Sequence, residues 1–190
     1  ASVRAELAGP APIADADAPP FRLGLVGWLG YELRGETMGV PPAYASRYPD
    51  AAFLRVDRAV AVTADGAAEL LALGDAWDGE LRAWRDATED AVRGCRDAAP
   101  RPLDPITPRP LDSVAARWRD DDETYLASIR ACQAAIREGE AYQLCLTTEV
   151  EVPGRFDPAE VYARLRERSP SHHGALLRIA GVSLLSSSPE

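Results

Sequence analysis

Residues 120–152, "DDDETYLASIRACQAAIREGEAYQLCLTTEVEV", carry the clearest structural signals in the chain. The first part opens with four carboxylates, which favour a helix N-terminus, and closes at Gly139, which favours a helix end. Between them apolar side chains recur at helical spacing: Tyr125, Ile129, Cys132 and Ile136. This pattern predicts an amphipathic helix over residues 120–139.

The second part alternates in character, as a half-buried strand does. Tyr142, Leu144, Leu146, Thr148, Val150 and Val152 share one face, and Gln143, Cys145, Thr147, Glu149 and Glu151 share the other. The alternation predicts a strand over residues 141–152.

Toward the C-terminus a second helix is marked by its start. Asp157 is placed as its N-cap, Pro158 at the first helical position and Glu160 in a capping box, and the helix must stop before Pro170. Two strands around Ala180 and Gly181 follow. The order helix, strand, helix, strand, strand predicts an α+β fold with a mostly antiparallel sheet.

The N-terminal half contains more strand than helix. Residues 21–39 predict a buried strand, in which Gly24, Gly27 and Gly30 admit close backbone or aromatic neighbours. The spacing of these glycines is not that of a dinucleotide-binding loop. Residues 51–74 predict two strands joined by a turn at Asp65 and Gly66, and residues 79–95 predict a helix.

Residues 98–113 include five prolines and can form neither a helix nor a central strand. We therefore expect an N-terminal region over residues 1–98, a proline-rich linker over residues 99–113, and a further domain over residues 114–190.

Composition limits the class of protein. With 190 residues, 46% of them hydrophobic, the chain has the composition of a globular protein. Its net charge of −9 argues against a nucleic-acid-binding protein, which would need a basic surface. It has no apolar run of the ~18 residues that span a membrane and no signal peptide, so we expect a cytoplasmic protein. Cys95, Cys132 and Cys145 are expected to be reduced thiols.

Lysine and asparagine are absent, and all 21 basic residues are arginines. Codons for both missing residues begin with two adenines, which indicates a high-GC bacterial genome. Chemistry that requires a lysine nucleophile or a phosphate-loop lysine cannot be completed by these residues.

Simple catalytic or metal-binding motifs are not convincing here. His172 and His173 are adjacent and point apart on an extended chain, the carboxylates of residues 120–123 suit a helix start, and Ser186–Ser188 lack a nucleophile elbow. We therefore expect no metal site among these residues.

Five segments together resemble a known family: "GLVGWLGYEL", "PDAAFLRVDRAVAV", "GEAYQLCLTTEV", "LRERSPSHHGALL" and "SSSPE". In order and spacing they resemble the chorismate-utilising enzymes, and among these component I of aminodeoxychorismate synthase. The resemblance runs from about Phe21 to Glu190.

The resemblance implies a four-layer α/β/β/α fold with orthogonally packed, mostly antiparallel sheets, cut off before its C-terminal half. It implies chorismate as substrate, ammonia from a glutamine amidotransferase subunit or fused domain, and Mg²⁺ bound by residues of the missing half. It also implies that the chain alone is inactive. The glutamate of the family's Ser-Pro-Glu-Arg-Phe motif falls on Glu190, which would be a general acid that helps the ring hydroxyl of chorismate to leave.

A second family motif, Asn-Pro-x-Pro-Tyr, lines an aromatic amino-acid pocket. Its matching residues here are Ser169, Pro170, Ser171, His172 and His173, so that the second proline and the tyrosine are replaced. The Leu-Leu-Glu-Ser segment that completes this pocket is also absent from the sequence.

Three functions remain open. The first is amination of chorismate to 4-amino-4-deoxychorismate, for 4-aminobenzoate and folate or for an antibiotic. The second is that of anthranilate synthase component I, in the tryptophan pathway. The sequence "CLTT" at residues 145–148 disfavours this second function. The third is a complete, non-enzymatic module that binds a small ligand or a partner.

Overall fold

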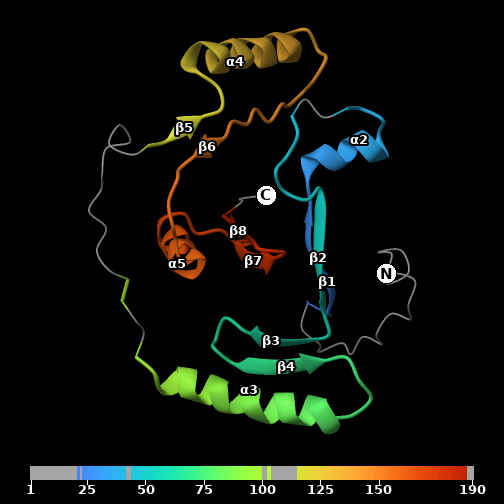
Figure 1. The fold of residues 1–190 in the computed structure, drawn as a ribbon, viewed down its shortest axis with the longest axis vertical. Coiled ribbons are helices and arrows are strands. Elements are labelled where there is room, and N and C mark those ends of the chain that lie inside the picture. The colour runs from blue at the N-terminus through green and yellow to red at the C-terminus, as the bar shows by residue number, and fades with distance from the viewer. Residues whose placement is uncertain (1–20, 22, 42–43, 100–101, 104–114, 188–190) are drawn as a thin grey trace. The chain divides into compact units, whose positions relative to one another are not determined.

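The computed structural model describes residues 21, 23–41, 44–99, 102–103 and 115–187 (Figure 1). The chain divides into two compact units, one made of residues 1–101 with 170–190 and the other of residues 102–169. Both mix helices with antiparallel strands, which confirms the predicted α+β class. The division into residues 1–98, 99–113 and 114–190 stays a prediction, because most of the linker, residues 100–101 and 104–113, lies outside the described part.

The first unit begins with an antiparallel pair. Strand β1 (Gly24–Leu29) pairs with β2 (Ala51–Val56), so that Gly27 lies opposite Phe53. The short helices η1 (Tyr31–Leu33) and α2 (Arg34–Thr37) follow β1. The strand predicted over residues 21–39 is therefore confirmed only for β1, which is half-buried rather than buried, and residues 31–37 are helical instead.

Gly27 is required by the close approach of the two strands. A Cβ at this position would overlap the carbonyl oxygen of Ala52 and would lie 2.8 Å from the Cα of Phe53. Both atoms belong to the backbone of β2, so neither can move without moving the strand.

A second hairpin follows directly. Strand β3 (Arg58–Val62) pairs with β4 (Ala68–Ala72) around the predicted turn, where Gly66 has φ +84°. The prediction of one strand before that turn was wrong, since the chain bends at Asp57 and forms β2 and β3. The side chain of Asp57 pairs with Arg58 at 3.0 Å, and the two halves of the run enter different ladders.

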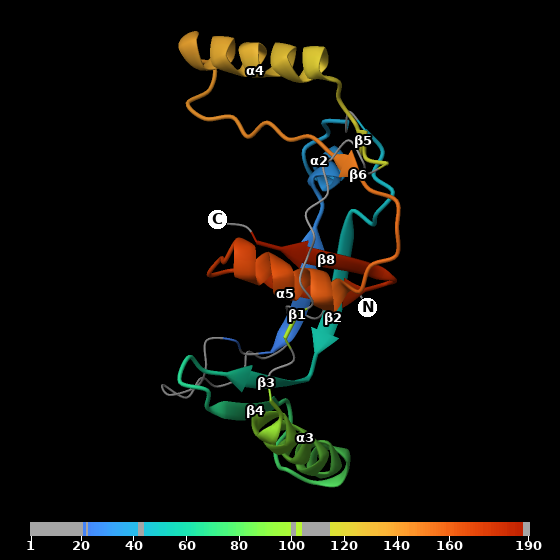
Figure 2. The ribbon, with the colours of Figure 1, turned by 90° about the vertical axis from the view of Figure 1, so that its left-hand side faces the viewer.

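Helix α3 (Gly79–Asp97) lies along the β3–β4 hairpin, as Figures 1 and 2 show, and agrees with the helix predicted over residues 79–95. At its start the Trp77 and Trp84 rings stack with centroids 6.3 Å apart, and the Arg58 guanidinium lies 6.0 Å from the centroid of Trp84. This stack joins β3 to the first turns of the helix.

Strands β7 (Ala175–Ile179) and β8 (Val182–Ser186) form the last hairpin of the first unit, and β7 contacts β2. Both strands were predicted around Ala180 and Gly181.

In the second unit, helix α4 (Asp122–Arg137) confirms the helix predicted from the opening stretch. The Asp121 carboxylate accepts a hydrogen bond from the Thr124 N–H at 2.8 Å and caps the N-terminus. At the other end Gly139 has φ +78°, and the Glu140 N–H reaches back to the Ala135 carbonyl at 3.0 Å. This pair of features forms a Schellman C-cap, in which glycine avoids the strain of the left-handed conformation.

Helix α5 (Pro158–Arg168) begins at the predicted Asp157 N-cap, whose carboxylate accepts a hydrogen bond from the Ala159 N–H at 2.8 Å. Glu160 does not act as the predicted capping-box partner: its carboxylate pairs with Arg164 one turn later, at 2.5 Å.

The strand predicted over residues 141–152 is wrong for most of its length. Strand β6 covers only Val150–Glu151, where it pairs with the equally short β5 (Arg117–Trp118). Alternation makes a strand only where a neighbour offers a ladder, and among the described residues β5 is that neighbour. Most of the rest of the segment has no regular secondary structure and is exposed: Tyr142 is 94% exposed and Leu144 44%.

Candidate functional site

The β7–β8 hairpin carries the chain toward the predicted general acid. Its turn consists of Ala180 (φ +51°) and Gly181 (φ +78°), and Ile179 pairs with Val182 on either side. Two positive φ angles are typical of the type I′ turn that suits the twist of a hairpin. Glu190 itself lies outside the described residues, so its role stays a prediction.

Ala180 holds a conformation that an L-residue with a Cβ avoids, at a cost of about 1–2 kcal/mol. We expect Ala180→Gly to raise the free energy of unfolding by about 0.5–1 kcal/mol, after subtracting the greater freedom of glycine in the unfolded chain. Urea denaturation measures the change. The control is Ala175→Gly in β7, where φ is ordinary and the same substitution should destabilise; equal effects at both positions would contradict a strained turn.

The predicted aromatic pocket at Pro170, Ser171, His172 and His173 forms a turn between α5 and β7. The His173 N–H donates to the Ser171 hydroxyl at 3.3 Å, and the Gly174 N–H reaches the Ser171 carbonyl at 3.4 Å. Both histidines are exposed. Their assignment to an aromatic pocket stays a prediction.

Another groove, which the sequence did not reveal, lies between the β1–β2 pair and β8 and has a volume of about 390 Å³. The Trp28 indole N–H donates to the Pro49 carbonyl at 3.1 Å, which orients the ring. Aromatic and aliphatic walls with one carboxylate and three hydroxyls suit a small cyclic ligand that bears polar substituents. The lining residues are Trp28, Gly30, Glu32, Ser46, Tyr48, Pro49, Val182, Ser183, Leu184 and Leu185.

This groove was missed because its two sides are more than 130 positions apart in the sequence. The available signal was Trp28 inside the glycine-rich run, where small neighbours leave room beside a large ring.

A polar cluster in the second unit connects the start of α4 to the segment before β6. The Thr148 hydroxyl donates to the Asp120 carboxylate at 2.6 Å, and the Arg119 guanidinium donates to the Thr147 carbonyl at 2.8 Å. Arg119 and Asp120 also pair with each other at 3.2 Å. The predicted role of Asp120 as part of the acidic helix start is therefore incomplete, since its side chain binds a segment 28 residues away.

The surroundings of Asp120 lower the pKa of its carboxyl group. The hydrogen bond from Thr148 is the largest cause, partial burial opposes it, and the Arg119 guanidinium adds to it. Because the pKa is lowered in the folded protein, this carboxylate stabilises the fold above its unfolded pKa of ~3.9, and the contribution disappears as the pH falls through the folded value.

We therefore expect Thr148→Val to destabilise the protein at pH 6 and to have a smaller effect at pH 3, which is below the unfolded pKa of ~3.9, where the stabilising contribution of the Asp120 carboxylate is already falling. Urea unfolding at the two pH values measures this. Thr147→Val is the matched control. The Thr147 side chain is exposed, and the Asp120 carboxylate accepts its hydrogen bond from Thr148 and not from Thr147. A loss of stability that is the same at both pH values would contradict the coupling.

No three His, Cys, Asp or Glu side chains of the described residues come together as a metal site. All three cysteines are free thiols. Within the described ranges, none of the helices has the length and apolar character that crossing a bilayer requires.

Comparison with known proteins places the chain among chorismate enzymes. Residues 3–190 match the family described as chorismate binding enzyme. The chain is 38% identical over 178 residues to aminodeoxychorismate synthase of Streptomyces pristinaespiralis and 40% identical over 175 residues to that of Streptomyces griseus. It is 30% identical over 190 residues to anthranilate synthase component 1 of Arthrobacter globiformis.

Each of these alignments covers 90% of this chain, but the chain spans only 24%, 23% and 35% of the three relatives. The crystal structure of anthranilate synthase component I from Streptococcus pneumoniae matches the fold with a TM-score of 0.64 at 18% identity, over 93% of this chain and 40% of that one. The family match extends over nearly the whole sequence, and the chain belongs to the chorismate binding enzyme family.

Proposed function

We propose that the chain is the N-terminal part of an aminodeoxychorismate synthase component I, which replaces the 4-hydroxyl of chorismate with ammonia. The observation that carries the proposal is 38–40% identity to two aminodeoxychorismate synthases over 90% of the chain. The product, 4-amino-4-deoxychorismate, would lead to 4-aminobenzoate for folate or for an antibiotic.

In this proposal the described residues work as part of a longer enzyme. The relatives are about four times as long as the matched region, and the large apolar side chains of the segment before β6, Tyr142, Leu144 and Leu146, are exposed. We expect a four-layer α/β/β/α arrangement of orthogonal sheets in the longer protein, with this segment paired in a ladder. The 190-residue chain alone is expected to be inactive.

Ammonia would come from a glutamine amidotransferase, as a separate subunit or a fused domain, and Mg²⁺ would be bound outside the described residues. Glu190 is proposed as the general acid. The leaving hydroxyl departs as water when a proton is delivered to its oxygen, so the group in this position must be protonated at working pH.

The test uses the full-length enzyme with chorismate, magnesium ion and ammonium, and identifies the product by mass and retention time. The 190-residue chain is the control. 4-Amino-4-deoxychorismate from the longer enzyme alone supports the proposal. Anthranilate would place the protein in the other branch, and absence of turnover by the longer enzyme would favour a binding module.

Replacing ammonium with glutamine tests the nitrogen source. If the amidotransferase is a separate subunit, glutamine should support turnover only after that subunit is added, whereas ammonium should support it without the subunit. A fused enzyme would use either source alone.

A further inference from the structure

The groove between the β1–β2 pair and β8 is acidic. Among the described residues that line it, Glu32 of η1 is the one charged side chain, and none is an arginine or a histidine. In the part of the chain that the structure describes, the Glu32 carboxylate makes no hydrogen bond and no ion pair. The groove therefore carries a negative charge that a bound group could neutralise.

Gly30 makes room for this carboxylate at the wall of the groove. The Gly30 N–H donates to the Asp50 carbonyl at 2.6 Å, which joins the end of β1 to the start of β2. A Cβ at position 30 would lie 3.2 Å from that carbonyl oxygen and 3.4 Å from Oε2 of Glu32. The carboxylate thus lies against the space that a side chain at position 30 would occupy, and both residues line the groove.

The indole of Trp28 supplies an aromatic surface beside the carboxylate. Its N–H is bound to the Pro49 carbonyl, and no stacked ring or guanidinium of the described residues covers its faces. The Tyr48 ring also lines the groove, but the Arg47 guanidinium lies 5.2 Å from its centroid, so this ring already has a cationic partner. We therefore assign the aromatic contact to Trp28, since tryptophan is the side chain that attracts cations most strongly.

The opposite wall comes from β8 and is mostly apolar. The four lining residues of this strand are consecutive, although successive side chains of a strand point to opposite faces. All four can border one groove only if the groove runs along the edge of the strand. Among the described strands β8 pairs with β7 alone, so its other edge presents backbone carbonyl groups that can accept hydrogen bonds. The four residues are Val182, Ser183, Leu184 and Leu185.

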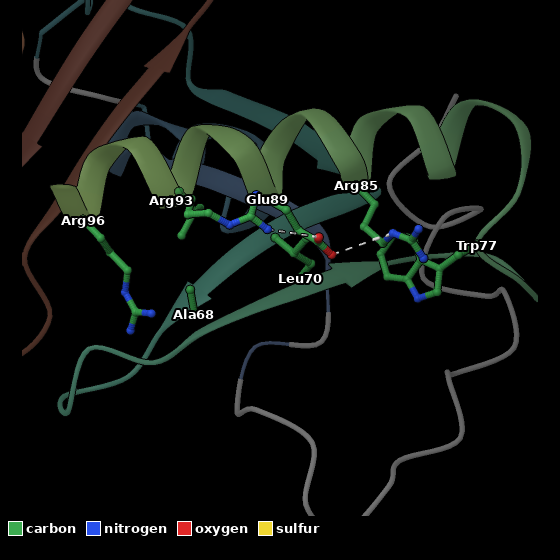
Figure 3. A pocket seen from close by; sticks show the side chains of 8 residues that line it. Ala68, Leu70, Trp77, Arg85, Glu89, Arg93 and Arg96 are labelled. Carbon is green, nitrogen blue, oxygen red and sulfur yellow. Dashed lines mark ion pairs between the residues drawn. The ribbon is translucent and has the colours of Figure 1, made fainter. Parts of the chain in front are cut away.

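A second groove, of about 450 Å³ between α3 and β4, shows the opposite situation (Figure 3). There Glu89 lies between Arg85 and Arg93, at 3.8 Å and 3.9 Å, and the Trp77 ring stacks on Trp84. These charges and rings have partners within the protein, and we assign no ligand to that groove.

The lining of the acidic groove selects one class of ligand. An anion would be repelled by Glu32 and would find no arginine in the lining, and among the described residues Glu32 belongs to no cluster that could hold a metal ion. A primary ammonium group has three donors and one positive charge, which match a carboxylate, the hydroxyls of the lining and the carbonyls of a strand edge. The volume of about 390 Å³ leaves room for an apolar body as well.

We propose that this groove binds a primary amine with an apolar or aromatic body, the ammonium group on Glu32 and Trp28 and the body against β8. An amino acid fits less well, because its carboxylate would lie near Glu32 with no arginine in the lining to pair with. The inference goes beyond the proposed function and does not depend on it.

The probes are 2-phenylethylamine, 2-phenylethanol and L-phenylalanine, which share one ring and differ in charge. Each is titrated by calorimetry into the full-length protein without chorismate or glutamine, so that the result does not depend on amination of chorismate. We expect the amine to bind at least about tenfold more tightly than the other two, which corresponds to about 1.4 kcal/mol. Affinity for the alcohol or for the amino acid that equals affinity for the amine would overturn the proposal.

Glu32→Gln tests the carboxylate and separates this groove from any other site for amines. The substitution keeps the size of the side chain and removes its charge, so affinity for the amine should fall about tenfold, whereas affinity for the alcohol should stay the same. Glu36→Gln on α2 is the matched control, because Glu36 is exposed and does not line the groove. Unchanged affinity for the amine in Glu32→Gln would contradict the assignment.

Trp28→Leu tests the aromatic contact. Loss of the indole should weaken binding of the amine and the alcohol several-fold, and Trp118→Leu, at an exposed tryptophan of β5, should leave both unchanged. Circular dichroism confirms folding of each variant, and Glu32→Gln alone decides the question if Trp28→Leu does not fold. A folded Trp28→Leu protein with full affinity for the amine would overturn the proposal.

Discussion

Replacing Glu190 with glutamine in the longer enzyme is expected to lower kcat by about 100- to 10,000-fold, which is the range of general-acid catalysis. The amide has the size of the carboxylic acid but cannot donate a proton to a leaving hydroxyl. Because this role rests on the proposed function, product formation from chorismate must be established first with the unsubstituted enzyme.

The pH profile distinguishes proton donation from a structural role. An ordinary glutamate, with a pKa of about 4.3, is only ~0.2% protonated at pH 7, so a general acid here needs a raised pKa. The unsubstituted enzyme should then lose activity as the pH rises through that raised pKa, and Glu190→Gln should lack this decline. Glu167→Gln on α5 is the control. A variant at position 190 that keeps both its rate and its pH profile would remove Glu190 from the mechanism.

The largest effect on stability is expected from Gly27→Ala. The added methyl group would overlap the backbone of β2 at Ala52 and Phe53, so that the β1–β2 ladder must separate or shift. We expect a loss of about 3 kcal/mol or more, beyond ordinary overpacking, because no side-chain rotation relieves a clash with backbone.

Gly94→Ala in α3 is the matched control. A Cβ at Gly94 meets nothing within 4 Å, and alanine favours the helix by about 0.8–1 kcal/mol over glycine. The two substitutions add the same methyl group and should move the thermal midpoint in opposite directions, as followed by circular dichroism. A small effect at Gly27 would mean that β1 and β2 lie farther apart than described.

The elements that could be predicted are those whose ends are encoded locally. Asp121 and Gly139 delimit α4, and Asp157 with Pro158 starts α5, through bonds that reach only a few residues along the chain. The turns of the β3–β4 and β7–β8 hairpins are marked by Gly66 and Gly181, which accept positive φ. Such signals need no knowledge of distant partners.

Features that depend on distant partners were predicted poorly. The alternation of residues 141–152 predicted a strand, but a strand forms only where a neighbouring strand can pair with it. Among the described residues β5 is that neighbour, and only two of its residues pair with β6. The bend at Asp57 separates two ladders, and no local signal marked it. The groove beside Trp28 needs β8, and the groove beneath α3 needs β4, so neither could be assembled from one segment alone.

The polar cluster at Asp120 and Thr148 also determines how the second unit opens. Helix α4 makes no extensive contact with another described helix or strand. The segments before and after it are joined by the short β5–β6 ladder and by the hydrogen bonds of Arg119 and Asp120 to Thr147 and Thr148. Amide hydrogens along α4 should therefore exchange with solvent in one cooperative opening, at a free energy below that of global unfolding. The hydrogen bonds of Arg119 and Asp120 to Thr147 and Thr148 thus determine how often the segment between them, which includes α4, opens to solvent.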